Sequence, residues 1–120
     1  MTVKETAAFL RQHDNYLILT HKRPDGDTIG CAAALCRALR QLGKRAFVLP
    51  NPQASSLFTP YFEGLLAEDG FAPDTVVSVD IAARGLFPDN AQEYLPRVDL
   101  AIDHHPSFEG FGKANIVRPE

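Results

Sequence analysis

Tryptophan is absent from this 120-residue sequence, and its only two cysteines are Cys31 and Cys36. They lie five positions apart in a predicted helix, so their side chains point about 140° apart around its axis. Two thiols separated in this way cannot bind one metal ion from a single helix face. We therefore expect reduced, partly buried thiols, as is usual in the cytoplasm.

The sequence also lacks an excess of positive charge and any long apolar run. Its 12 Lys and Arg residues against 15 Asp and Glu residues give a formal net charge of -3, which excludes a general electrostatic affinity for long duplex nucleic acid. No apolar run approaches the roughly 20 residues of a membrane span, and the polar N-terminal segment does not resemble a signal peptide. We therefore expect a cytoplasmic protein with no membrane partner, whose charge still permits a small anionic substrate.

Three common catalytic motifs are missing as well. The sequence has no G-x-G-x-x-G fingerprint for dinucleotides, and Gly43-Lys44-Arg45 lacks the glycine and hydroxyl residue of a P-loop. It also has no G-x-S-x-G, so a serine hydrolase built on a nucleophile elbow is not expected.

The residues that are present predict one folded α/β domain. With 45% apolar and 22% charged residues, the composition is that of an ordinary globular protein. Nearly continuous apolar runs, typical of buried parallel strands, alternate with amphipathic segments, typical of helices. Strands are predicted at residues 16–20, 46–49, 76–79 and 100–102, and helices at 3–12, 28–42, 61–68 and 91–95. This alternation favours a mostly parallel sheet flanked by helices.

The ends of the second predicted helix and the end of the sequence add to this expectation. Thr28 is predicted as the N-cap of the second helix, and Gly43 follows its C-terminal end. The sequence stops soon after the apolar pair Ile116-Val117, with no closing helix. We therefore expect residues 1–120 to form a domain that is incomplete at its C-terminus.

Histidines and aspartates follow three of the predicted strands. They are His21, Asp25 and Asp27 after the first strand, Asp80 after the third, and Asp103, His104 and His105 after the last. Because ligands of open α/β sheets bind outside the carboxyl ends of the strands, these groups are expected to converge. Crowded carboxylates repel one another unless protons or a metal ion neutralise them. The sequence therefore predicts a cation site at this edge of the sheet.

The type of ligand indicates which cation would bind. Imidazole and carboxylate without thiolate point away from structural zinc and from calcium and toward manganese, with magnesium, cobalt or iron(II) as alternatives. Two Mn²⁺ ions that share a bridging carboxylate would suit the in-line displacement of a phosphoryl group. Lys22 and Arg23, in the same loop, are weaker candidates for contact with an anionic substrate.

Each element also has a simpler interpretation. The Pro-Asp-Gly sequence at 24–26 could be only a turn, although an EF-hand loop is excluded because Cys36 occupies the position of its bidentate glutamate. Asp80 could cap a turn, and adjacent histidines such as His104 and His105 need not point at one site. The joint placement of the three segments at strand ends carries the prediction.

Three segments resemble motifs I, II and III of the DHH phosphoesterases, in order and in spacing: His21-Lys22-Arg23-Pro24-Asp25-Gly26-Asp27, Asp80, and Asp103-His104-His105. The strings HKRPDGDTIG and DHHPS are similar in particular to the nanoRNase type, which acts on short oligoribonucleotides and on 3′-phosphoadenosine 5′-phosphate. The resemblance implies a manganese-dependent phosphoesterase that hydrolyses such substrates by two-metal catalysis.

The resemblance also implies a role for each residue. The implied ligands form two groups that share a carboxylate: His21 and Asp25 for one ion, Asp27 and His104 for the other, and Asp80 between them. His105 would face the scissile phosphate, and Asp103 would orient the neighbouring imidazole. Cys31 stands where nanoRNase-like sequences usually carry serine.

Family members carry a further metal-binding aspartate, motif IV, and a second domain, DHHA1. Neither is found in residues 1–120, so the resemblance implies a truncated DHH catalytic domain without the DHHA1 domain. Other functions stay open: a cyclic dinucleotide phosphodiesterase or an inorganic pyrophosphatase of the same family, although the pyrophosphatases typically have threonine in place of Gly26. From another class, an inactive metal-binding fragment could associate into a homo-oligomer through uncovered sheet surfaces.

Overall fold

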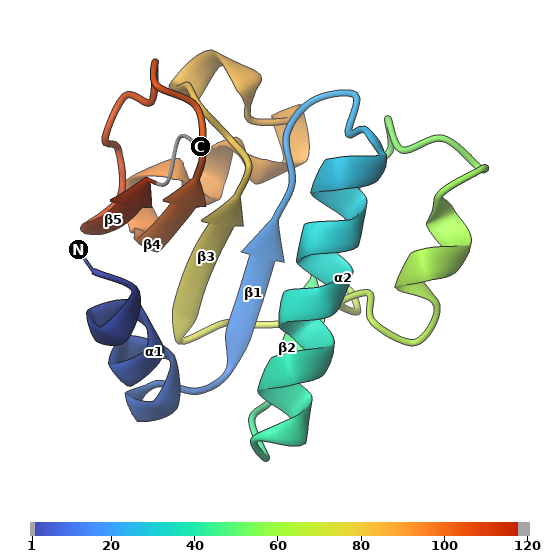
Figure 1. Ribbon diagram of the computed structural model, residues 1–120. Coiled ribbons are helices and arrows are strands. Elements are labelled where there is room, and N and C mark those ends of the chain that lie inside the picture. Colours follow the sequence, from blue (N-terminus) through green and yellow to red (C-terminus); the bar gives the residue numbers. More distant parts are fainter. Residues whose placement is uncertain (1, 118–120) are drawn as a thin grey trace.

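A five-stranded, entirely parallel sheet forms the centre of the computed structural model, which describes residues 2–117 (Figure 1). Its strands are β1 (Tyr16–Leu19), β2 (Ala46–Val48), β3 (Thr75–Val79), β4 (Val98–Asp103) and β5 (Ala114–Val117), in the order β2-β1-β3-β4-β5. The helices are α1 (Val3–Gln12) and α2 (Gly26–Gln41), with 3₁₀ helices η1 (Thr59–Phe62), η2 (Arg84–Leu86) and η3 (Asp89–Arg97). The predicted α/β class with a parallel sheet flanked by helices is confirmed.

Strand β1 lies inside the sheet between β2 and β3, and every one of its residues is apolar and buried. Side chains alternate along a strand, so Tyr16 and Ile18 point to one face of the sheet and Leu17 and Leu19 to the other. A strand that is apolar on both faces requires a covering layer on each side. The sheet is accordingly the middle layer of three.

The two faces of the sheet are covered by different kinds of structure. Helix α2 places its buried stripe, which includes Ile29, Cys36 and Leu39, against one face, where α1 also packs. The other face is covered by the irregular segments around η3, including Phe87 and Ala91. None of the helices within residues 2–117 has the length and apolar character needed to cross a membrane.

The topology creates a switch point between β1 and β3. From β1 the chain crosses to β2 on one side, whereas β3, β4 and β5 follow one another on the other side. Ligand sites of parallel α/β sheets form outside the carboxyl ends of the strands at such a point. Beside α2, the face over β3, β4 and β5 leaves a groove of about 660 Å³ with apolar walls that include Leu35, Ile102 and Ile116. One end of this groove reaches the same carboxyl edge.

Three predictions from the sequence are corrected by the structure, and one strand was not predicted. Asp25, not Thr28, is the N-cap of α2, because its carboxylate accepts a hydrogen bond from the Thr28 N–H at 2.9 Å. The helix predicted at 61–68 is wrong, since only the single turn η1 forms and Gly64 follows at φ 76°. The short helix expected at 91–95 is a longer 3₁₀ helix, η3, and the apolar pair at 116–117 belongs to a strand, β5.

Candidate metal centre

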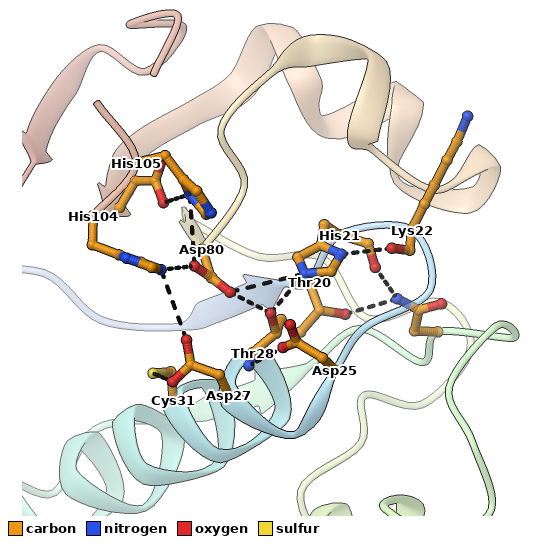
Figure 2. Close-up of polar contacts among 12 residues, drawn as sticks. Thr20, His21, Lys22, Asp25, Asp27, Thr28, Cys31, Asp80, His104 and His105 are labelled. Carbon is orange, nitrogen blue, oxygen red and sulfur yellow. Dashed lines mark hydrogen bonds and ion pairs between the residues drawn. The ribbon is translucent and has the colours of Figure 1, made fainter. Parts of the chain in front are cut away.

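The three segments predicted to converge do meet, at the carboxyl ends of β1, β3 and β4 (Figure 2). His21 follows β1, Asp80 follows β3, and the pair His104-His105 follows β4. The first turn of α2 adds Asp25 and Asp27. Groups up to 84 residues apart in the sequence therefore share one site, because parallel strands end at the same edge.

Asp80 lies at the centre of this site, where it contacts residues from all three segments, and it is only 7% exposed. Its Oδ1 lies 2.6 Å from His104 Nε2 and 3.8 Å from His105 Nδ1. Its Oδ2 accepts a hydrogen bond from Thr28 Oγ1 at 2.5 Å and lies 3.8 Å from His21 Nε2. A backbone φ of 59° turns the chain sharply here, in a left-handed conformation that aspartate tolerates better than most residues. One carboxylate thus faces a different histidine group with each oxygen.

Two buried carboxylate oxygens at the site have no hydrogen-bond donor within the described residues: Asp80 Oδ1 and Asp103 Oδ2. The contact from His104 Nε2 to Asp80 Oδ1 is short, but the two atoms do not have hydrogen-bond geometry. His104 Nε2 and Asp80 Oδ1 thus lie close together without a hydrogen bond between them, which is how two ligands of one metal ion would be arranged. Leaving such oxygens unpaired is costly, and a cation at the centre would satisfy them.

The hydroxyl of Thr28 provides a second argument for a cation. His21 Nδ1 lies 2.5 Å from the Lys22 carbonyl oxygen, which can only accept, so the tautomer of a neutral ring that fits this contact carries its proton on Nδ1 and presents a lone pair on Nε2. Thr28 Oγ1 is 2.7 Å from that Nε2 and 2.5 Å from Asp80 Oδ2. The hydroxyl has one proton and donates it to Asp80 Oδ2, so the lone pair of Nε2 in that tautomer of His21 stays available to a metal ion.

Two groups of ligand atoms are compact enough to hold an ion, with all atoms of a group within 4.8 Å of one another. The first is His21, Asp25 and Asp80, and the second is Asp80, Asp103, His104 and His105. Asp80 belongs to both. Asp27 lies outside both groups, although its Oδ2 is 3.7 Å from His104 Nε2. The structure therefore brings all seven predicted metal, catalytic and orienting residues to one place, while their roles stay predictions.

His105 is oriented by Asp103, whose side chain is buried. His105 Nδ1 donates to Asp103 Oδ1 at 2.6 Å, and this hydrogen bond raises the pKa of His105 against the smaller, opposing effect of burial. The bond leaves Nε2 as the nitrogen that can meet a ligand. The ring of His104 lies 4.3 Å from that of His105, centroid to centroid, so the adjacent histidines do approach one site.

Asp25 both caps helix α2 and belongs to a candidate ligand group. As the N-cap of α2, its carboxylate accepts the Thr28 N–H, and that hydrogen bond lowers the pKa of Asp25 below its usual range. A carboxyl group held in its ionised form at a helix start is available to a cation through its remaining lone pairs.

The two cationic residues of the loop are not brought to the centre. Figure 2 shows the Lys22 side chain pointing away from the carboxylates, with only its backbone carbonyl in contact with His21. Arg23 is exposed at φ 48°, and its backbone N–H donates to Gln53 Oε1 at 2.8 Å. Among the described residues, no side-chain contact links Arg23 to the centre.

Two residues of the site were not predicted. The Thr28 hydroxyl was interpreted only as a helix cap, and nothing in the sequence indicates its contact with Asp80, 52 positions away. Asn51 donates from Nδ2 to Thr20 Oγ1 and to the His21 carbonyl, both at 2.9 Å, and so fixes the loop that carries His21. Asn51 lies in a segment predicted only as a loop, so nothing in the sequence indicated its contact with the site.

Comparison with known proteins gives three findings. A family pattern described as the DHH family, N-terminal domain, matches residues 15–120. The chain is 33% identical over 115 residues to the bifunctional oligoribonuclease and PAP phosphatase NrnA of Thermus thermophilus, covering 85% of this chain and 31% of that protein. Its fold is similar to the crystal structure of an exopolyphosphatase-related protein from Bacteroides fragilis, with a TM-score of 0.77 and 23% identity over 97% of this chain and 38% of that one. The chain thus spans about a third of the length of the proteins it matches.

Proposed function

The chain belongs to the DHH family of phosphoesterases, and from this we propose that it hydrolyses phosphoester bonds of short oligoribonucleotides and of 3′-phosphoadenosine 5′-phosphate. The observation that carries the proposal is the pair of ligand groups joined by Asp80. The relative from Thermus thermophilus is named for these same two activities. Both substrates are small phosphate esters, which agrees with a chain that has no net positive charge.

The donor atoms of the centre fit divalent cations. We assign His21, Asp25 and Asp80 to one position and Asp27, Asp80 and His104 to the other, as the family resemblance implies. Imidazole and carboxylate ligands favour Mn²⁺, with Mg²⁺, Co²⁺ and Fe²⁺ as alternatives. When bound, two such cations polarise a phosphoryl oxygen and stabilise the charge that develops on the attacking and leaving oxygens.

The protein groups would contribute position and charge. The aspartates would repel a phosphate group while they are not neutralised, so substrate binding is expected to depend on the cation. His105, held through Nδ1 by Asp103, can keep a proton on Nε2, and its raised pKa favours that protonated form. It is therefore suited to face a phosphate oxygen and to donate a proton to a leaving group.

The remaining predictions about the protein as a whole follow from family membership. We propose that residues 1–120 supply the DHH part of the catalytic unit, and that regions of the relatives beyond the matched third grip the rest of the nucleotide. The free thiols of Cys31 and Cys36 agree with a cytoplasmic location. Homo-oligomerisation stays a prediction.

Hydrolysis of a labelled RNA dinucleotide and of 3′-phosphoadenosine 5′-phosphate by the 120-residue chain, with and without Mn²⁺, tests the proposal. We expect Mn²⁺-dependent release of mononucleotide and of phosphate, and a loss on the order of 100-fold or more in Asp80→Asn. Asp69→Asn, an exposed aspartate outside the centre, is the matched control. Faster turnover of a cyclic dinucleotide or of pyrophosphate would favour those alternatives, and no Mn²⁺-dependent turnover of any substrate would favour the inactive metal-binding fragment.

A further inference from the structure

The loop that carries His21 is held by a segment just beyond β2, residues 50–53, which contributes no residue to either ligand group. The side-chain amide of Asn51 donates to the Thr20 hydroxyl oxygen and to the His21 carbonyl oxygen, both at 2.9 Å. Its Oδ1 accepts the Gln53 N–H at 3.0 Å. A carbonyl oxygen can only accept and a backbone N–H can only donate, so these contacts fix the orientation of the amide. Asn51 therefore uses both of its donor hydrogens on one loop.

Gln53 holds the same loop at a second point. Its Oε1 accepts the Arg23 N–H at 2.8 Å, and Arg23 has a φ of 48°. A residue other than glycine adopts this left-handed conformation at a cost, and it keeps the conformation where surrounding contacts hold it there. The hydrogen bond from Arg23 to Gln53 is such a contact.

The segment that makes these bonds is itself restrained. Pro50 and Pro52 flank Asn51, and their rings fix φ at both positions. The side chain of Asn90 also donates to the Pro50 carbonyl oxygen at 2.7 Å. Asn51 is thus presented to the loop from a backbone with little conformational freedom left to lose.

The bonds to Asn51 and Gln53 hold the two successive peptide groups that decide how the His21 ring lies. Asn51 binds the carbonyl of the peptide between His21 and Lys22. Gln53 binds the N–H of the next peptide, between Lys22 and Arg23. The carbonyl of that second peptide is the one that His21 Nδ1 contacts at 2.5 Å, as Figure 2 shows. A backbone partner of this kind fixes the ring orientation and the tautomer of a metal-binding histidine.

We propose that Asn51 and Gln53 are positioning residues for the cation position that contains His21, and that they raise its affinity without touching the cation. The inference rests on the proposed function, which assigns His21, Asp25 and Asp80 to that position. Within the described residues, the side-chain hydrogen bonds of Asn51 and Gln53 reach the His21 loop and none reaches the residues after β4. Their effect should therefore be confined to one of the two positions, whereas Asp80 belongs to both ligand groups.

The tautomer of His21 in the metal-free chain gives a test that needs neither metal nor substrate. In ¹⁵N spectra at about pH 8, where an imidazole is neutral, the wild type should carry the His21 proton on Nδ1. Asn51→Ala should show both tautomers, because the Lys22 carbonyl is no longer held in place. In the matched control, Asn115→Ala, the tautomer should not change, since the Asn115 amide also bonds to backbone but at Gly112. A wild type without the Nδ1 proton, or an unchanged tautomer in Asn51→Ala, would overturn the proposal.

Calorimetric titration with Mn²⁺ then tests the cation position. The wild type and Asn115→Ala should bind two ions, whereas Asn51→Ala should keep one site unchanged and bind the other about tenfold more weakly. Gln53 is exposed, so Gln53→Ala should fold even if Asn51→Ala does not, and it should weaken the same single site. Equal weakening of both sites, or unchanged affinity in both variants, would overturn the proposal. A wild type that binds no Mn²⁺ would refute the proposed function and the cation position with it, while the tautomer spectra separately decide whether Asn51 orients His21.

Discussion

Replacing Asp80 by Asn should stabilise the metal-free protein. The Asp80 and Asp103 carboxylates are buried, and their ligand atoms lie within 4.8 Å of each other. Two unit charges at that separation repel by roughly 3 kcal/mol at an effective dielectric constant of 20. The nearby imidazoles offset part of this repulsion. Asparagine accepts the φ of 59° as well as aspartate does and keeps an oxygen for the Thr28 hydroxyl. We therefore expect a gain of about 1–2 kcal/mol in the free energy of unfolding.

Urea denaturation in excess chelator, and again in excess Mn²⁺, measures this effect. In chelator, Asp80→Asn should unfold at higher urea than the wild type, and Asp69→Asn should stay within about 0.5 kcal/mol of it. In Mn²⁺ the order should reverse, because only the wild type gains the full stabilisation from ligand binding. A metal-free Asp80→Asn protein that is less stable than the wild type by more than about 1 kcal/mol would refute the reasoning, because Asp80 would then be needed for folding.

Three further predictions concern groups that hold the site and the core in place. Thr28→Val should lower the metal-free unfolding free energy by about 1–3 kcal/mol, measured in urea with chelator, because a buried hydrogen bond to Asp80 is lost. Burial raises the pKa of Tyr16 from 10.0 in the unfolded chain to about 12. The stability that Tyr16 contributes is therefore complete below pH 10 and is lost as the pH rises to about 12. Urea midpoints measured across this range should fall. Ile29→Ala, at a fully buried position of α2, should lower the unfolding free energy by about 2–5 kcal/mol in the same assay.

Each of these three has a matched control. Thr6→Val removes a buried hydroxyl from α1 whose bond goes to the Thr2 carbonyl, so it should lower the metal-free unfolding free energy by no more than Thr28→Val does in the same assay. Tyr16→Phe should abolish most of the alkaline loss of stability, and an unchanged loss would assign it to another group. Leu57→Ala, at a position 74% exposed, should change stability by less than about 0.5 kcal/mol. An Ile29→Ala effect as small as that of Leu57→Ala would contradict the packing described here.

The strands and the convergence of the site could be predicted because they depend on local patterns. β1 is a continuous apolar run, which is characteristic of a central parallel strand. Once the strands are parallel, residues that follow them must gather at one edge, so His21, Asp80 and His104 could be placed together before the structure was seen. β5 was not predicted as a strand, since it begins with Ala114 and Asn115, which give no apolar run.

The errors arose where distant contacts decide local structure. Asp25 and Thr28 are both good N-cap residues, and the choice depends on Asp80, which engages the Thr28 hydroxyl from 52 positions away. The helix predicted at 61–68 does not form because the Val48 N–H donates to the Leu65 carbonyl and the Val48 carbonyl accepts from the Ala67 N–H. Pairing with the edge of β2 holds this segment extended and overrides its helical propensity.

Calorimetric titration of the metal-free 120-residue chain with Mn²⁺, alongside Asp80→Asn and Asp69→Asn, tests the central claim most directly. If Asp80 joins two cation positions, the wild type and Asp69→Asn should each bind two ions, and Asp80→Asn should lose or strongly weaken both sites together. Unchanged two-site uptake by Asp80→Asn would contradict the account, because neither position could then depend on the shared carboxylate.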